Sequence, residues 1–272
     1  MKLPKINEKK IVKLLGEGKR LDERGPFEYR DISIETGVSN NAEGSARVKI
    51  GKTEVIVGIK LGVQEPYPDH QDEGTMITSM EFGPICGERY ESGPPKMNAI
   101  ETSRVVDRGI RESGFIDWKK LCIKKGEKVW SICIDIYCIN DDGNALDASS
   151  LGAVAALKMS KFPEYDEKEG RVKFGELTDK PLPLTENIPV TMTFHKIGEK
   201  LLVDPNRDEE DASESRMTLS ISCPKKEKMI NSMQKGEIIP LSANDLDEII
   251  TQSEKIYDAL FPDMEKQIKN LK

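Results

Sequence analysis

The sequence has few histidines and no cysteines in a metal-binding spacing, which disfavours several kinds of catalytic and metal site. Only His70 and His195 occur among 272 residues, so a Ser-His-Asp hydrolase, a Cys-His hydrolase and a histidine-rich metal site have few ways to form. The five cysteines include no C-x-x-C pair, which argues against a zinc site and a disulfide framework. We expect His70 in a surface loop, His195 in a strand, and no bound metal or cofactor.

Long apolar runs are missing as well. No segment approaches the roughly 18 apolar residues of a membrane-spanning helix, and Met1–Arg20 is too charged for a secretory leader. We therefore expect a cytoplasmic protein with no membrane partner. The sequence is instead rich in charge, with 33% charged residues, a net charge of −7 and a mean hydropathy of −0.52. Its length predicts a sizeable core in two domains, or in two halves of one.

The rest of the chain is organised around the stretch from Val129 to Met159. Val129–Ile139 is dense in β-branched and aromatic residues, which predicts a buried strand. Asp141–Asn144 has the composition of a turn, and Ala145–Met159 predicts a helix whose many small residues let it pack close against a sheet. A helix entered directly from a strand presents unpaired N–H groups, which commonly hold a phosphate.

The side chains at the start of this helix argue against a phosphate. Asp141, Asp142 and Asp147 lie there with no Arg or Lys beside them in the sequence, so they would repel an anion unless another chain supplied cations. The alternative is an ordinary strand-turn-helix in which acidic residues stabilise the helix N-terminus. These residues alone leave both interpretations open.

The pattern of the whole chain predicts an α+β protein with mixed sheets, each backed by helices, rather than a doubly wound parallel fold. We interpret Lys161–Gly170 as a charged connector between two halves. This gives an N-terminal helix over residues 1–18, one domain over 19–165, and a second over 166–272 that ends in a long helix with an N-cap at Ser242. The other predicted helices are Asn7–Gly16 and Asn98–Ser113. The other predicted strands are Tyr29–Thr36, Ala46–Ile50, Thr53–Val63, Thr75–Phe82, Leu121–Ile123, Arg171–Leu177, Ile188–Lys196, Lys200–Asp204, Met217–Ser222 and Met229–Met233.

Three arginines share one stripe of the helix predicted at Asn98–Ser113. Arg104, Arg108 and Arg111 follow one another by four and three residues, with Glu101 one step towards the N-terminus. The stripe is either a solvated face with a Glu101–Arg104 pair, worth about 0.3–0.5 kcal/mol, or a surface that binds phosphates. Because the protein is acidic overall, three aligned guanidinium groups favour the second interpretation.

Four segments carry a resemblance to a known family: Lys19–Arg24 before Tyr29–Ile32, Glu43–Val57, Asp141–Ser149 and Val203–Glu210. The first two resemble the opening of the RNase PH family of phosphate-dependent exoribonucleases. The last two are similar to the non-catalytic RNase PH-like ring subunits of the archaeal exosome. The likeness runs from about Gly18 to Leu260, with the motifs in the family's order.

The resemblance implies a two-domain α+β fold and a partner. The partner is a catalytic RNase PH-like paralogue that alternates with this subunit in a hetero-hexameric ring of three dimers, below RNA-binding cap subunits. Single-stranded RNA would pass down the central channel and lose nucleotides to inorganic phosphate. Arg104, Arg108 and Arg111 would hold the RNA backbone beside the partner's active site. Aromatic residues make up only 6% of the chain, so we expect no selectivity for particular bases.

The departures from the family pattern concern catalysis. Active members carry a carboxylate pair that assists proton transfer or metal binding, and the two positions fall here on Glu210 and Arg216. Active members also carry Ser, Thr or Arg groups at the helix start, where this chain has Ala145, Leu146 and Asp147. The resemblance therefore implies degenerate active-site positions at Leu146, Glu210 and Arg216, and no catalytic residue in this chain.

Two rival functions stay open. A phosphorolytic RNase active on its own could use Glu210 with Asp208 or Asp204 as a shifted acid pair. An assembly module without an RNA role would keep the RNA affinity of its complex when Arg104 and Arg108 are both changed to Glu.

Overall fold

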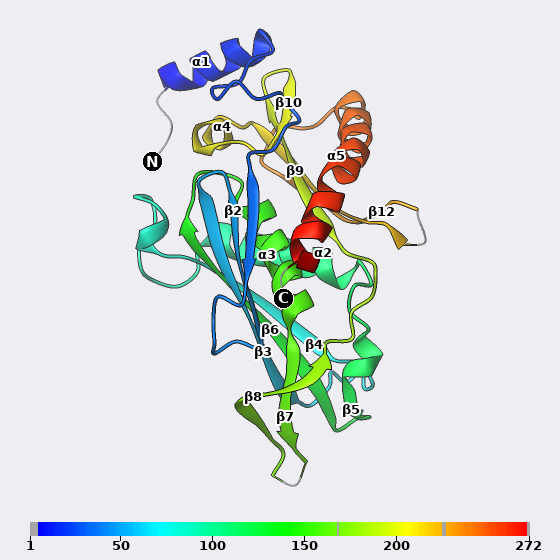
Figure 1. The fold of residues 1–272 in the computed structure, drawn as a ribbon. Helices are drawn as coiled ribbons and strands as arrows, with labels where there is room; N and C mark the ends of the chain where they lie inside the picture. Colours follow the sequence, from blue (N-terminus) through cyan, green and yellow to red (C-terminus); the bar gives the residue numbers. More distant parts are fainter. Residues whose placement is uncertain (1–4, 168, 225–226, 271–272) are drawn as a thin grey trace.

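The computed structural model describes residues 5–167, 169–224 and 227–270. Within these residues the chain forms two main sheets, and helices α2 and α3 pack between them (Figure 1). Helix α3 contacts β2 and β3 of the first sheet and β9 of the second, while α2 contacts β4 and the strands β11 and β12. The predicted α+β class with helix-backed mixed sheets is confirmed. The helices are α1 Lys5–Gly16, α2 Met97–Arg111, α3 Ala145–Met159, α4 Arg207–Asp211 and α5 Ala243–Asn270.

The first sheet has the strand order β1-β2-β3-β6-β4, with β5 paired to β6. Its pairs are antiparallel except β4 with β6, which are parallel. Gly51 adopts φ 57° in the two-residue turn that joins β2 to β3, a conformation that favours glycine. The strands are β1 Ile32–Thr36, β2 Gly44–Ile50, β3 Thr53–Gln64, β4 Thr75–Phe82, β5 Cys122–Lys124 and β6 Lys128–Asn140.

The second sheet is antiparallel, with the order β10-β9-β11-β12. The predicted N-cap of the last helix is confirmed, because Asp245 N–H donates to Ser242 Oγ at 3.1 Å and Ser242 N–H donates to the Asp245 carboxylate at 2.7 Å. Helix α5 packs on β9 and reaches across to β1. The strands of this sheet are β9 Val190–Ile197, β10 Lys200–Val203, β11 Ser215–Ser222 and β12 Met229–Gly236.

Helix α3 is buried along most of its length, as its small residues predict. At Gly152 an added Cβ would lie 2.7 Å from Cγ2 of Val57 on β3, so only glycine allows the helix this close to the sheet. The helix packs on β9 of the second sheet as well, so it sets the spacing between the two sheets.

The segment Lys161–Gly170, which we interpret from the sequence as a charged connector, contains regular structure. Lys161–Asp166 forms strand β7, which pairs antiparallel with β8, Arg171–Pro181, in a separate two-stranded sheet. The segment contains three charged residues and a proline and lacks a regular alternation of apolar and polar residues, so its sequence does not indicate a strand. The proposed division at residue 165 falls inside this hairpin, and the division itself stays a prediction.

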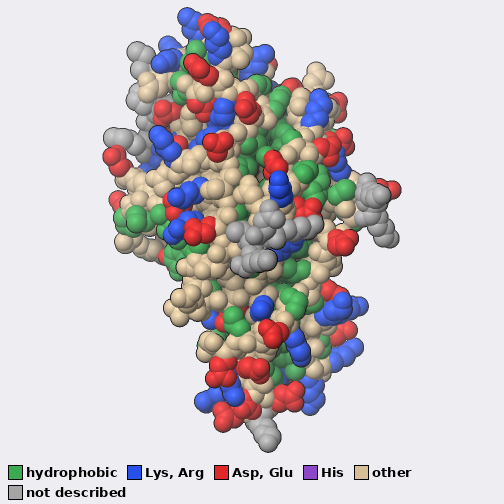
Figure 2. Space-filling model, viewed as in Figure 1, with side chains coloured by type: hydrophobic (Ala, Val, Ile, Leu, Met, Phe, Trp, Pro, Cys, Tyr) green, Lys and Arg blue, Asp and Glu red, His purple; other side chains and the backbone are tan. Residues whose placement is uncertain are grey.

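The outer surface carries both signs of charge. Figure 2 shows Lys and Arg side chains interspersed with Asp and Glu over the face in view, in keeping with 33% charged residues. Among the described residues, no helix is long and apolar enough to span a membrane.

Candidate functional site

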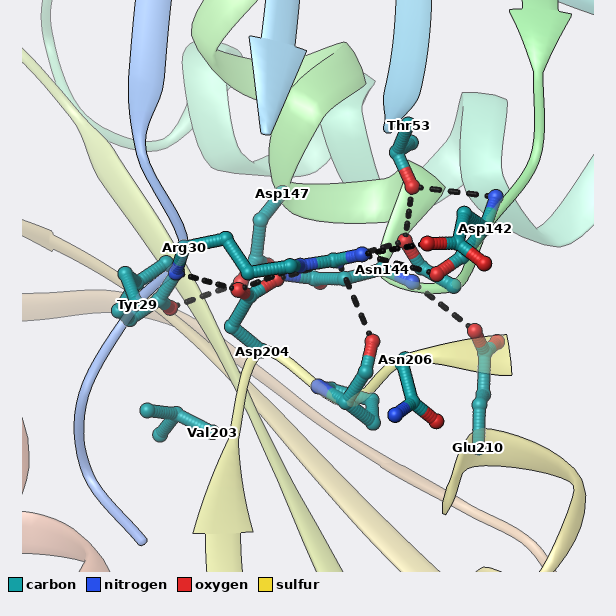
Figure 3. A network of polar contacts seen from close by, with 12 residues as sticks. Tyr29, Arg30, Thr53, Asp142, Asn144, Asp147, Val203, Asp204, Asn206 and Glu210 are labelled. Carbon is teal, nitrogen blue, oxygen red and sulfur yellow. Dashed lines mark hydrogen bonds and ion pairs between the residues drawn. The ribbon is translucent and has the colours of Figure 1, made fainter. Parts of the chain in front are cut away.

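The candidate site is the mouth of α3, by which we mean the turn Asp141–Asn144 and the segment 204–210 that faces it. Thr53 Oγ1 fixes the turn by donating to the Gly143 carbonyl at 2.6 Å and accepting from Asp142 N–H at 3.2 Å. Gly143 has φ 87°, and an added Cβ would lie 2.5 Å from the Pro205 carbonyl oxygen. The second half of the chain therefore packs directly against the turn (Figure 3).

A carboxylate already occupies the start of α3. Glu210, on α4, accepts a hydrogen bond at 2.9 Å from the backbone N–H of Asn144, the residue that caps α3 (Figure 3). Burial raises the pKa of Glu210, while the charge of Arg207, 3.5 Å away, opposes that shift. The internal carboxylate thus sits where an anion bound at this helix start would sit.

The prediction of a mouth without arginine is wrong. Arg30, which is 112 residues from Asp142 in the chain, donates to the Asp142 carbonyl at 2.9 Å. Arg207 donates to Asp141 at 2.8 Å. Both guanidinium groups are bound to carboxylates of this chain, including Asp204 for Arg30 and Asp211 for Arg207. The mouth is therefore closed by internal ion pairs, and its aspartates do not depend on another chain for cations.

Asp204 lies at the centre of these contacts and is completely buried. Arg30 donates to it from its backbone N–H, Nε and Nη2, at 2.8, 2.9 and 2.7 Å. Arg24 Nη1 and Asn144 Nδ2 donate at 2.9 and 2.8 Å. Burial alone would raise the pKa of Asp204, but the Arg30 contacts and the Asn144 hydrogen bond lower it below its ordinary value. This carboxylate ties the start of the first half to the second half.

The contact between Arg30 and Asp204 also explains why β1 starts at Ile32 rather than at Tyr29 as predicted. The backbone N–H of Arg30 donates to Asp204 and not to a neighbouring strand. The chain therefore joins the sheet only after this residue.

Asp147 does not line the mouth. It lies inside the molecule, where it accepts hydrogen bonds from Tyr29 Oη at 2.8 Å and Thr193 Oγ1 at 2.7 Å. Burial raises its pKa to about 6, although those hydrogen bonds act in the opposite direction. The neighbouring Leu146 is buried and has no polar group to offer a ligand. Asp147 therefore ties α3 to β9 and to the segment before β1.

The geometry does not favour catalysis by Glu210 paired with Asp208 or Asp204. Asp204 is enclosed by its five donors, so it has no free face for a substrate. Asp208 is exposed on α4. Arg216 points to α2, where it forms an ion pair with Glu101.

The three arginines on α2 have different surroundings. Arg111 donates twice to Asp107 at 2.9 Å and to the Met76 carbonyl at 3.0 Å, and its guanidinium lies 5.5 Å from the Trp118 ring centroid. Arg104 and Arg108 are exposed and, among the described residues, have no hydrogen-bond or ion-pair partner. The Glu101–Arg104 pair considered from the sequence is absent because Glu101 binds Arg216 instead.

Arg104 and Arg108 line two hollows. A groove of about 660 Å³ lies between α2 and β12, and a smaller hollow of about 250 Å³ lies between α2 and β4. Thr78 of β4 lines the smaller hollow, and its hydroxyl has no hydrogen-bond partner within the described structure. Thr78 could not be identified from the sequence, since a threonine in a predicted strand carries no distinguishing signal.

Both histidines lie where expected, His70 exposed in a loop and His195 buried in β9. No three His, Cys, Asp or Glu side chains come together as a possible metal site within residues 5–167, 169–224 and 227–270.

Acidification is expected to destabilise the chain through His195. Burial, with the charges of Arg216 and Arg207, lowers its pKa from 6.5 to about 3. Between these values the unfolded chain takes up a proton that the folded chain excludes, so stability falls as the pH falls, by up to about 1.4 kcal/mol per pH unit. Urea unfolding measured across this range should give a shallower pH dependence for His195→Asn. Other titrating groups, such as Asp147, are common to both proteins, so equal slopes would contradict the assignment.

The chain has a two-domain fold of the RNase PH type. Helices α2 and α3 pack between its two main sheets, and Asp204 joins the two halves. The chain belongs to the 3′ exoribonuclease family: the family model for domain 1 matches residues 28–163, and the model for domain 2 matches residues 187–256. The resemblance seen in the sequence is confirmed.

Curated relatives and solved structures agree with this family. The chain is 45% identical over 248 residues to the exosome complex component Rrp42 of Methanocella arvoryzae, covering 91% of each chain. It is 49% identical over 240 residues to that of Methanosarcina acetivorans, covering 88% of this chain and 86% of the relative. It is also similar to a chain in a structure described as the Archaeoglobus fulgidus exosome with RNA bound to the active site, with TM-score 0.86, 39% identity, and coverage of 95% and 98%.

Proposed function

We propose that this chain is the non-catalytic subunit of an exosome, a 3′–5′ phosphorolytic exoribonuclease complex that degrades RNA in the cytoplasm. In this proposal it alternates with a catalytic RNase PH-like paralogue in a hetero-hexameric ring of three dimers, beneath RNA-binding cap subunits. It structures the partner's active site and positions single-stranded RNA. The relatives described as exosome complex component Rrp42 support the assignment.

The observation that carries the non-catalytic assignment is the carboxylate at the mouth of α3. An attacking phosphate would need the helix N–H groups and nearby cations, but Glu210 accepts from Asn144 N–H, and Arg30 and Arg207 are bound to internal carboxylates. A second anion there would meet the charges of Asp141, Asp142 and Glu210. The Leu146 side chain adds no donor, and Arg216 stands where the family resemblance leads us to expect a carboxylate.

The RNA role rests on Arg104 and Arg108. Their guanidinium groups are exposed and line a groove of about 660 Å³, and contacts with phosphates would hold an RNA strand without reading its sequence. Arg111 already binds Asp107 and the Met76 carbonyl, so in this proposal it supports the helix beside the RNA and adds its charge to the same face.

Phosphorolysis by three samples tests this function. Single-stranded RNA and inorganic phosphate are incubated with this chain, with its catalytic paralogue, and with the two mixed, and released nucleoside diphosphates are counted. We expect the mixture to be strongly active and this chain alone to be inactive. The paralogue mixed with an unrelated acidic protein is the control. Release of nucleoside diphosphates by this chain alone would overturn the proposal and favour an acid pair that includes Glu210.

A further inference from the structure

Arg216 and Glu101 form a contact between the second sheet and α2. Arg216 stands at the start of β11, and its guanidinium makes an ion pair with the Glu101 carboxylate. The Gln234 side chain of β12 donates to the same carboxylate oxygen at 2.9 Å. Glu101 is thus held by two donors from the second sheet, although it belongs to the helix that carries Arg104 and Arg108.

Gly236 makes room for this contact. It is the register partner of Arg216 on β12, and an added Cβ would lie 2.6 Å from Nη2 and 2.9 Å from Cζ of Arg216. Any other residue would press on the guanidinium itself. The Arg216 side chain is mostly buried, with 14% exposure, and its guanidinium would have to shift away from Glu101 to make room for such a residue. The local structure therefore directs this side chain to Glu101.

The ion pair between Arg216 and Glu101 affects whether Arg104 on α2 is neutralised within its own helix. Glu101 and Arg104 are three residues apart on one helix, a spacing at which opposite charges attract each other. If Glu101 were free, it could compete with a phosphate for Arg104, whereas Asp107, the other carboxylate three residues from Arg104, is already bound by Arg111. Instead Glu101 is bound by Arg216 and Gln234, and Arg104 has no partner among the described residues although both line the same groove.

We infer that Arg216 is a positioning residue for RNA: by binding Glu101, it leaves the guanidinium of Arg104 free to bind an RNA phosphate. The inference rests on the proposed function, because it needs Arg104 to contact RNA. It gives a role to the arginine that stands where active family members are expected to carry a carboxylate. Arg216 acts through Glu101 and does not itself touch the RNA.

The test measures the affinity of a fluorescent single-stranded oligoadenylate for the assembled complex with its catalytic paralogue, without phosphate, at several salt concentrations. Arg216→Met should weaken binding about two- to fivefold and make the slope of log affinity against log salt shallower by up to about 0.7, because one phosphate contact is lost. Adding Glu101→Gln should restore both the affinity and the slope. If the double variant stays as weak as Arg216→Met, Arg216 does not act through Glu101, and the inference is wrong.

Gly236→Ala provides a second variant that changes no charge. Its Cβ displaces the guanidinium from Glu101, so we expect the same loss and the same rescue by Glu101→Gln. Unchanged binding by both Arg216→Met and Gly236→Ala would also overturn the inference. Arg47→Met is the matched control, since Arg47 pairs with Glu35 and Glu54 on the first sheet and lines neither hollow.

A third comparison separates this inference from the proposed function. Arg104→Glu with Arg108→Glu should weaken RNA binding whether or not Arg216 has a role. If this double reversal has no effect, the proposed RNA contact fails. If it weakens binding while Arg216→Met does not, only the role of Arg216 fails.

Discussion

Asp204→Asn is expected to lower the free energy of unfolding of the chain by about 3–5 kcal/mol. The buried carboxylate accepts five hydrogen bonds, four of them from Arg24 and Arg30. An amide of the same size keeps an oxygen acceptor but removes the negative charge, so two mostly buried guanidinium groups lose a counter-ion. Urea unfolding, with the slope against urea unchanged, measures the loss.

Asp208→Asn is the matched control for this variant. Asp208 lies four residues away on the exposed face of α4, so the same chemical change should alter stability by no more than about 0.5 kcal/mol. Equal losses in the two variants would mean that the contacts of Asp204 contribute nothing specific.

Arg20→Met is expected to cost a similar amount, about 3–5 kcal/mol, at a separate buried ion pair. The Arg20 side chain is 1% exposed and its partner Glu209 is 0% exposed, with Nη2 and Oε2 2.6 Å apart. Arg20 also donates to the carbonyls of Val203 and Asp204, at 3.0 and 2.8 Å. Methionine keeps the unbranched stem of the side chain but leaves the Glu209 carboxylate buried without its cation.

A double-mutant cycle with Glu209→Gln isolates the pair. Glutamine removes the charge of Glu209 and keeps an oxygen that can accept from the Asn206 backbone N–H, a bond of 3.0 Å in the capping box of α4. The double variant should therefore lose less stability than the sum of the two single variants. Strict additivity in urea unfolding would show that the two charges do not interact.

Much of the fold was readable from the sequence because its strands and helices carry strong local patterns. The bounds of α3, Ala145–Met159, agree with the structure, since small and apolar residues predominate in this segment and a clear turn precedes it. Among the α-helices and strands of the described residues, two were missed, for different reasons. Strand β7, Lys161–Asp166, carries charge and a proline, and α4, Arg207–Asp211, is too short to show a helical period.

The candidate site was less readable, because its contacts join distant parts of the chain. Arg30 and Asp204 are 174 residues apart, and nothing in the sequence around either residue predicts that they are in contact. The same limit produced the wrong Glu101–Arg104 pair: spacing on a helix predicts neighbours on that helix, while Arg216 arrives from another element. The residues next to the turn Asp141–Asn144 in the sequence therefore did not reveal the arginines that lie beside it in the structure.

The position of Asp204 late in the chain has a consequence for synthesis on the ribosome. All strands of the first sheet have been synthesised once β6 ends at Asn140. Asp204, which binds Arg30, is synthesised 174 residues after Arg30. At ordinary elongation rates of roughly 5–20 residues per second, this interval lasts about 10–35 seconds. Throughout it, the segment before β1 is held by none of its final contacts with Asp204, so the nascent first half is completed only when the second half arrives.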